Sequence, residues 1–177
     1  MAPTPAECDQ LVALFNAGCH VELESRSRFL VDQYPDSGFS WKVLGASLQV
    51  QGKEALPVLQ RAAELLPDDA EAHGNLGVSL KDLGRLDEAE ASYRRALQIK
   101  PDYAEAHNNL GVTLNDLGRL DEAEASCRRA LQIKPDFAKA FSTLLLGRNY
   151  NLNLSRREVF TEHLCFAERF EVPLKAS

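Results

Sequence analysis

Apolar residues recur in the middle of the chain with the spacing of an amphipathic helix. Leu76, Leu80 and Leu83 stand at i, i+4 and i+7, which places them on one stripe of a helix. We therefore expect a helix over 71–83. It should end before Gly84, because glycine suits the left-handed position just past a helix end.

A second apolar stripe follows and predicts a second helix over 87–99. Asp87 and Glu88 open it, where acidic side chains favour the positive end of the helix dipole. Pro101 follows it, and proline cannot continue a helix. The inward side of this helix is expected to hold Ala89, Tyr93, Ala96 and Leu97.

This two-helix pattern is repeated along the chain. Residues 104–137 differ from residues 70–103 at only five positions, which gives a period of 34 residues. The same frame covers 38–69, although that unit is two residues short between Gly52 and Ala55. One helix pair cannot bury its apolar stripe alone, so the pairs are expected to stack on a shared core.

The frame weakens toward both ends. Residues 4–37 form a degenerate first unit in which leucines replace the small residues, at Leu11, Leu23 and Leu30. Residues 138–146 begin a fifth unit that then departs from the pattern.

The order Trp41-x2-Leu44-Gly45, followed by alanine and proline on this period, resembles the tetratricopeptide repeat. The resemblance implies an all-α fold, a right-handed superhelical solenoid of stacked helix pairs. The expected divisions are a degenerate repeat over 4–37, repeats over 38–69, 70–103 and 104–137, and a partial repeat, linker and C-terminal capping helix over 138–177.

The ends of the stack carry helix-start signals. Thr4, Pro5 and Glu7 predict an N-cap, a first-turn proline and a capping box. Ser155 and Glu158 form a second capping box. We expect it to follow a linker over 149–155 and to open a last helix over 156–170 that covers the open end.

Glycine recurs inside the first helix of successive units, at Gly45, Gly77 and Gly111. A glycine inside a helix costs about 1 kcal/mol relative to alanine. Its recurrence indicates a close helix crossing that offsets this cost. Ala55, Ala89 and Ala123 are expected to form the same crossing from the second helix.

Charge and composition argue against several classes of function. The net charge of −6 argues against a general nucleic-acid surface. No run of about 18 apolar residues predicts a membrane span, and the first residues lack the basic region of a signal peptide. We expect a cytoplasmic protein. Its cysteines, at 8, 19, 127 and 165, lack zinc or disulfide spacing.

Candidate chemistry is sparse. No catalytic triad, phosphate loop or metal motif occurs, so we expect no enzyme activity, cofactor or metal. His73 and His107 take the position of Trp41, which favours an aromatic-sized packing role. Cys127 replaces Tyr93 and is interpreted as a buried small side chain, with a reactive thiol as the alternative.

The tetratricopeptide resemblance implies that partners contact the first helix of each repeat. Exposed asparagines suit this role because an amide can donate and accept at a peptide backbone. The residues at those positions that we expect to contact a partner are Lys42, Glu71, Asn75, Lys81, Asp82, Glu105, Asn108, Asn109, Asn115 and Asp116. Solvated side chains that bind nothing are the alternative interpretation.

Chaperone-binding tetratricopeptide domains resemble one another in a clamp of two lysines, two asparagines and an arginine. Lys42 and Asn75 fit that clamp, but Ala46, Glu105 and Asn109 do not. We therefore expect no binding of acidic C-terminal tails.

The repeats also resemble those of O-linked N-acetylglucosamine transferases and their bacterial SPINDLY-like relatives, through NLG, LDEA and IKPDFAKA. In that family the groove holds the acceptor polypeptide. The sequence ends at Ser177, where the sugar-nucleotide lobes would begin, so we expect no sugar transfer by this chain. Val78 and Val112 stand where those repeats often have asparagine.

Three functions follow from these patterns. The first is a scaffold that binds an extended protein or peptide segment in a concave groove. The second is the acceptor-recognition region of a glycosyltransferase, and the third is a self-associating structural module. None of the three requires nucleic acid or a membrane.

Overall fold

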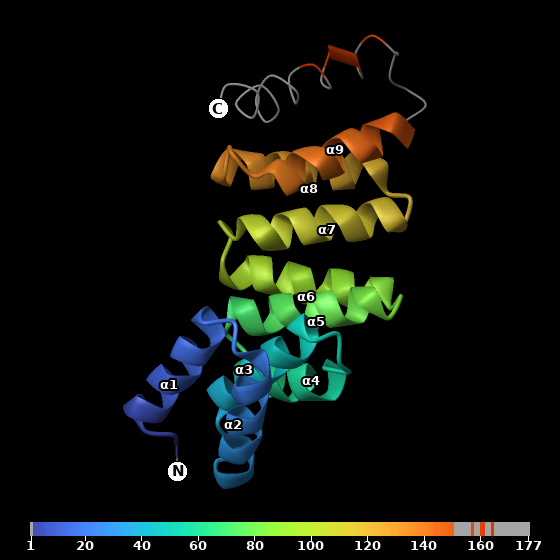
Figure 1. Cartoon of the computed structure of the whole chain (residues 1–177). Helices are drawn as coiled ribbons and strands as arrows, with labels where there is room; N and C mark the ends of the chain where they lie inside the picture. Colours follow the sequence, from blue (N-terminus) through green and yellow to red (C-terminus); the bar gives the residue numbers. More distant parts are fainter. Residues whose placement is uncertain (1, 151–156, 158–159, 162–163, 165–177) are drawn as a thin grey trace, which may run out of the picture. The chain divides into compact units, whose positions relative to one another are not determined.

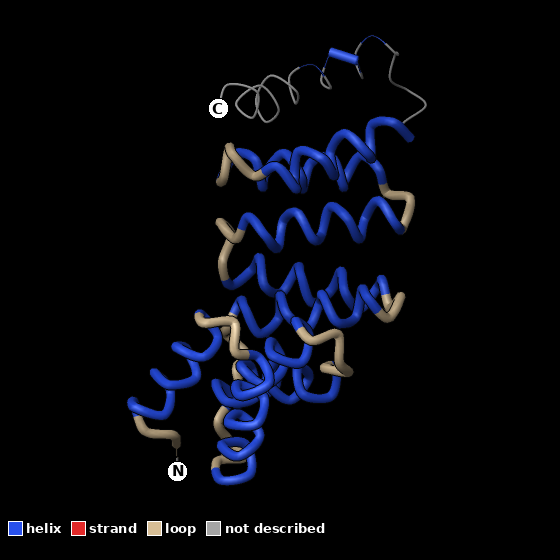
Figure 2. Tube along the Cα trace, in the orientation of Figure 1, coloured by secondary structure: helices blue, strands red, loops and turns tan. Residues whose placement is uncertain are grey.

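The chain folds into α-helices throughout its well-defined part. The computed structural model describes residues 2–150, 157, 160, 161 and 164. Residues 2–150 form nine helices and no strand (Figures 1 and 2). The helices are α1 (Pro5–Asn16), α2 (His20–Gln33), α3 (Gly38–Val50), α4 (Leu56–Leu65), α5 (Ala70–Asp82), α6 (Leu86–Ile99), α7 (Ala104–Asp116), α8 (Leu120–Ile133) and α9 (Ala138–Tyr150).

The chain divides into two compact units, Met1–Ile99 and Lys100–Ser177. In the first unit, α3 packs against α2 and α4, and α5 packs against α4 and α6. In the second unit, α8 packs against α7 and α9, and α7 also contacts α9. Each unit is thus built from successive helices that pair with their neighbours in sequence.

Helix boundaries agree with the periodicity to within one residue in the third repeat. The helix expected over 71–83 is α5 (Ala70–Asp82), and that expected over 87–99 is α6 (Leu86–Ile99). Gly84 has the left-handed φ of 74° that only glycine adopts at little cost. The all-α fold of paired helices is therefore confirmed.

The predicted start of α1 is also confirmed. Thr4 is the N-cap, and its Oγ1 accepts a hydrogen bond from the backbone N–H of Glu7 at 3.3 Å. The Glu7 carboxylate accepts the Thr4 backbone N–H at 2.8 Å in return. Two backbone donors that the helix itself leaves unpaired are thereby satisfied.

The mid-helix glycines lie where two helices cross at close range. A Cβ atom added to Gly77 would lie 2.6 Å from the ring of Tyr93. At Gly111 it would collide with the Cys127 thiol, and at Gly45 with Leu59. The facing residues stand four positions after the predicted alanines, Ala55, Ala89 and Ala123. Ala123 still contributes its carbonyl, 3.3 Å from the same point at Gly111.

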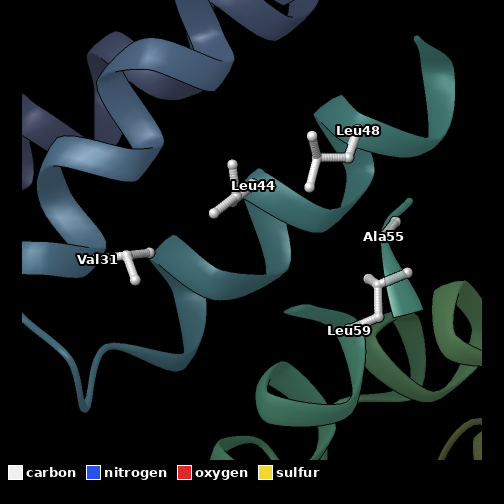
Figure 3. Close-up of a cluster of buried hydrophobic side chains, with 5 residues drawn as sticks. All are labelled: Val31, Leu44, Leu48, Ala55 and Leu59. Carbon is white, nitrogen blue, oxygen red and sulfur yellow. The ribbon is translucent and has the colours of Figure 1, made fainter. Parts of the chain in front are cut away.

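The first repeat is packed differently from the later ones. Leu11, Leu23 and Leu30 have no exposed surface and form one cluster. Larger side chains fill the α1–α2 interface where the later repeats have glycine and alanine. A second cluster joins α2, α3 and α4 through Val31, Leu44, Leu48, Ala55 and Leu59 (Figure 3).

The C-terminal expectations fall mostly outside the described residues. Ser155, Glu158 and most of the helix expected over 156–170 are among the residues that the structure does not describe. The linker expected from residue 149 starts too early, because α9 continues to Tyr150. Across the described part of the chain, every helix is too short or too polar to traverse a lipid bilayer.

We predict that Gly77→Leu lowers the free energy of unfolding by about 1–3 kcal/mol, because the new side chain must displace the Tyr93 ring. Chemical denaturation measures this loss. Ala91→Leu is the control, since Ala91 is exposed on α6 and should leave stability nearly unchanged. Equal stability of Gly77→Leu and the wild-type protein would contradict the close crossing.

Candidate functional site

The predicted partner-binding residues lie on the first helix of each repeat, which we call helix A. The helices A of the first unit include α3 and α5, and those of the second unit are α7 and α9. We use "helix-A face" for the side of these helices that carries those residues. The structure shows that several of them are already bonded to the neighbouring repeat.

Lys42 on α3 is held by the start of α5. Its ammonium donates to a carboxylate oxygen of Asp69 at 2.6 Å and of Glu71 at 3.1 Å. Burial alone would lower the pKa of Lys42, but these hydrogen bonds outweigh burial and raise that pKa above its ordinary value. Lys42 therefore links two repeats, and its charge is neutralised.

Asp69 serves both as this partner and as the N-cap of α5. One oxygen accepts the backbone N–H groups of Glu71 and Ala72 at 2.9 and 3.0 Å. Burial acts to raise the pKa of Asp69, but the hydrogen bond from Lys42 and the two backbone bonds together hold it below its usual value. With Lys42 neutralised in this way, the clamp for acidic tails loses one of its two matching residues.

Gln49 and Asn115 make the same bond in different repeats. Gln49 Nε2 donates to the backbone carbonyl of Asn75 at 2.9 Å. Asn115 Nδ2 donates to the backbone carbonyl of Thr143 at 3.4 Å. Both amides stand at the twelfth position of their repeat and reach the sixth position of the next. Gln49 was not among the residues predicted from the sequence, although it stands at the same position of the 34-residue frame as Asn115.

Asn108 is a packing residue and not an exposed amide. Only 6% of its surface is exposed. Its Oδ1 accepts a hydrogen bond from the Thr143 hydroxyl at 3.1 Å, and its Nδ2 donates to Asn109 at 3.3 Å. The expectation that Asn108 contacts a partner does not fit this burial, because α9 covers the side chain.

Asn75 and Asn109 remain partly exposed on α5 and α7. The side-chain amide of Asn75 makes no hydrogen bond with any described residue, although its backbone carbonyl is used by Gln49. Asn109 Oδ1 accepts from Asn108, which leaves its own amide N–H groups available. Val78 and Val112, three residues further on, are also partly exposed. Each helix therefore presents an amide followed by an aliphatic side chain.

The predicted charged residues flank these pairs. Lys81 and Asp82 form an ion pair of 2.9 Å at the end of α5. Glu105 lies 3.8 Å from Lys134. Glu71, Asp82, Glu105 and Asp116 are exposed. Exposed pairs of this kind contribute little to stability, so these side chains can turn toward a charged partner at low cost.

An open depression of about 430 Å³ adjoins the helix-A face in the first unit. Its lining includes Gln49 of α3, Asp82 of α5 and the turn between α3 and α4. Its remaining lining residues are Gly52, Lys53, Glu54, Ala55, Leu56, Ser79 and Leu83. This depression was not predicted from the sequence.

His73, His107 and Trp41 share one structural role. The indole N–H of Trp41 donates to the carbonyl of Pro35 at 2.8 Å. Nε2 of His73 lies 3.1 Å from the carbonyl of Pro67, and Nε2 of His107 lies 3.1 Å from that of Pro101. A carbonyl can only accept, so each Nε2 carries the proton. These rings close the turn before helix A, and burial lowers the pKa of His107.

Cys127 is buried, with no exposed surface, as the packing interpretation expected. Burial raises the pKa of its thiol to about 12, and the nearby Glu124 carboxylate adds to the shift. A thiol at neutral pH is a poor nucleophile when its pKa is so high. The reactive-thiol alternative does not fit this environment. Among the described residues, no three metal-ligand side chains gather in one place.

The tetratricopeptide repeat family profile matches residues 51–104 and 82–136. These matches span the 34-residue units and the paired helices α5–α6 and α7–α8. This chain is a tetratricopeptide repeat protein. A search of the curated proteins finds no match to its sequence.

Solved tetratricopeptide structures share the fold. MamA is 22% identical, with a TM-score of 0.80, and the alignment covers 92% of this chain and 95% of that chain. YrrB is described as a TPR protein with an unusual peptide-binding site. It is 18% identical, with a TM-score of 0.78 and coverage of 98% and 91%.

An O-GlcNAc transferase mutant from Thermobaculum terrenum is also similar. It is 26% identical to this tetratricopeptide chain, with a TM-score of 0.70. The alignment covers 74% of this chain but 26% of the transferase. The likeness is thus to one part of that longer protein.

We predict that Lys42→Met lowers the free energy of unfolding by about 1–2 kcal/mol at pH 7, because it removes charge-assisted bonds to the next repeat. The pKa of Asp69 is lowered in the folded state, so its stabilising contribution is complete above the ordinary pKa of about 3.9 and is lost as pH falls through the folded-state value. The difference between variant and wild type should therefore shrink on acidification.

Urea denaturation at several pH values measures this dependence. Lys134→Met is the control, since its ion pair with Glu105 is exposed and longer. A constant difference between Lys42→Met and wild type from pH 7 to acid would contradict the assignment of Asp69 as the titrating partner.

We predict that native Cys127 resists thiol reagents. The test uses the triple variant Cys8→Ser, Cys19→Ser, Cys165→Ser, in which Cys127 is the remaining cysteine. Ellman's reagent at pH 8 should label it only after denaturation, because burial suppresses the thiolate. The variant that retains Cys19 alone should react at once, since Cys19 is exposed. Fast labelling of native Cys127 would contradict its buried position.

Proposed function

We propose that this tetratricopeptide chain is a protein-interaction module that binds an extended polypeptide segment along its helix-A faces. The observation that carries the proposal is the unbonded side-chain amide of Asn75, which is partly exposed beside Val78. The same pair recurs as Asn109 and Val112 one repeat later. Amide N–H groups that the fold leaves without an acceptor, on Asn75 and on Asn109 one repeat later, are suited to an external ligand.

The chemistry of this pair fits a peptide in extended conformation. An asparagine amide supplies a donor and an acceptor, which match a backbone C=O and N–H without reading the sequence. A neighbouring valine supplies a small apolar contact for a partner side chain. Binding would then depend on backbone bonds for position and on aliphatic contacts for part of the affinity.

Several predicted contacts are better assigned to the fold. Lys42, Asn108 and Asn115 are bonded to adjacent helices. We propose that these residues hold the spacing of successive helices A, and that Asn75 and Asn109 contact the partner. Glu71, Lys81, Asp82, Glu105 and Asp116 are proposed as outer contacts, where exposed charges steer association more than they add affinity.

YrrB, whose fold this chain shares, is described as a TPR protein with an unusual peptide-binding site. At 18% identity it supports the fold only. The identity of the partner therefore has to come from the chemistry of this chain.

We predict that Asn75→Ala/Asn109→Ala weakens partner binding by about tenfold, because two amide hydrogen bonds to the partner are lost. Partners are captured from cell extract with the immobilised chain, identified by mass spectrometry, and titrated as purified segments. Gln98→Ala/Gln132→Ala is the matched control, since both glutamines are exposed on the second helices of the same repeats. Unchanged affinity of the asparagine variant would show that the helix-A face does not contact the partner.

A second candidate is the acceptor-recognition region of a glycosyltransferase. The likeness to the Thermobaculum terrenum transferase at 26% identity favours it. It requires catalytic lobes on the same polypeptide or on an associated one. Co-purification of a sugar-nucleotide-binding protein with the tagged chain supports this candidate, and its consistent absence argues against it.

A further inference from the structure

The depression beside α4 arises from the two residues that the second repeat lacks. Gly84 and Ala89 are five positions apart, as are Gly118 and Ala123, but Gly52 and Ala55 are three apart. In the later repeats that stretch contains a Leu-Asp pair, at 86–87 and 120–121, and it begins the second helix. In the second repeat α4 starts only at Leu56 and has 10 residues, whereas α6 has 14.

The fourth repeat shows what the missing leucine does. Leu120, the first residue of α8, lines the gap between its own repeat and α9, together with Asn115, Ala123 and Gly147. That gap has a free volume of about 0 Å³, so no water molecule can enter it. The corresponding residues of the second repeat are Gln49, Ala55 and Ser79, and around them a volume of about 430 Å³ is open.

The Glu54 carboxylate beside the depression also lacks the arginine that pairs with the corresponding glutamate of the later repeats. Glu88 and Glu122 are each held by an arginine through two bonds of 2.6 and 2.7 Å. Their counterpart is Glu54, and the counterpart of the arginine is Lys53. The Lys53 ammonium instead donates to Glu24 at 2.6 Å. Within the described part of the chain, the exposed Glu54 carboxylate forms no ion pair.

We propose that this depression binds an adjacent arginine and leucine of an extended partner segment. The leucine would take the place that Leu120 fills in the fourth repeat, against Ala55, Leu56 and Leu83. The arginine would pair with Glu54, as Arg119 does with Glu122. The partner would thereby supply the arginine and leucine that the full-length repeats carry themselves, as Arg85-Leu86 and Arg119-Leu120.

The observations agree on this occupant. The size of the depression is within the range of ligand pockets, and its apolar wall includes Leu83, which is 58% exposed. The unpaired carboxylate selects a cationic neighbour and argues against an acidic one. The site adjoins the helix-A face through Gln49 and Asp82, so this inference rests on the proposed function and specifies one anchor of the same partner.

The probe is the synthetic peptide acetyl-SGRLSG-amide, titrated into the full chain and followed by ¹⁵N–¹H correlation spectra. We expect millimolar binding, with shifts at the backbone amides of Gly52, Glu54 and Leu83. The leucine-to-alanine peptide SGRASG should bind about tenfold more weakly, because it lacks most of the buried apolar area. The arginine-to-alanine peptide SGALSG should bind about two- to fivefold more weakly, because an exposed ion pair is worth little.

Three protein variants locate the site. Insertion of Leu-Asp between Lys53 and Glu54 restores the 34-residue period and should abolish peptide binding, while circular dichroism shows a retained helical fold. Leu83→Ser removes an exposed apolar wall and should weaken binding severalfold even if the insertion variant fails to fold; Val21→Ser is its control, since Val21 is 74% exposed elsewhere in the same unit. Glu54→Gln should weaken SGRLSG binding but not SGALSG binding, whereas the matched Glu88→Gln should change neither.

Several outcomes would overturn the proposal. They are absence of SGRLSG binding to the wild-type chain, equal binding of SGRASG, and full binding by the insertion variant or by Leu83→Ser. Failure here is distinct from failure of the helix-A face. If the captured partner is weakened by Asn75→Ala/Asn109→Ala but not by the insertion, the anchor site is wrong and the helix-A face stands. If the insertion weakens binding of the captured partner but Asn75→Ala/Asn109→Ala does not, the anchor site stands and the helix-A face is wrong.

Discussion

The contact between a glycine of helix A and a buried side chain of the second helix is the constraint on which each later repeat depends. The Tyr93 ring can approach α5 this closely only because Gly77 has no Cβ, and the same holds for the Cys127 thiol and Gly111. Interiors pack at the density of organic crystals, so a methyl group in such a contact has no space. Because the glycine side of helix A packs against the second helix of its own repeat, the polar side of helix A is left for other contacts.

That polar side has two uses, which the structure separates. Gln49 and Asn115 donate to carbonyls of the following helix A, and Lys42 holds the start of α5. Asn75 keeps an unbonded amide. A repeat protein needs its polar residues both to keep successive helices in register and to meet a ligand. Adjacent positions of one helix therefore perform different tasks, although their chemistry is alike.

The sequence predicts the fold well because period and turn residues are local properties. The 34-residue recurrence, Gly84 and the Thr4 capping box placed helix ends to within a residue. The candidate site was predicted less completely. The sequence does not distinguish an asparagine that is exposed to solvent from one that is hydrogen-bonded to a neighbouring threonine. Asn108 is buried because Thr143 and α9 lie within reach, and no pattern inside its own repeat reports that. The depression beside Glu54 follows from an absent leucine, so its signal lay in the length of the second repeat and not in any residue there.

The near identity of residues 70–103 and 104–137 has a consequence for how the chain reaches its native arrangement. The surfaces that α6 and α8 offer to a helix A differ mainly by a phenol at Tyr93 and a thiol at Cys127. A nascent α5 can therefore collapse onto the wrong copy with little loss of contact energy, and such off-register species are the characteristic kinetic traps of repeat proteins. The differences that distinguish native from swapped pairing are few: Tyr93 or Cys127 on the second helix, and Gly74 or Asn108, Ser79 or Thr113, and Lys81 or Asn115 on helix A. These few differences reduce frustration in an otherwise near-degenerate landscape.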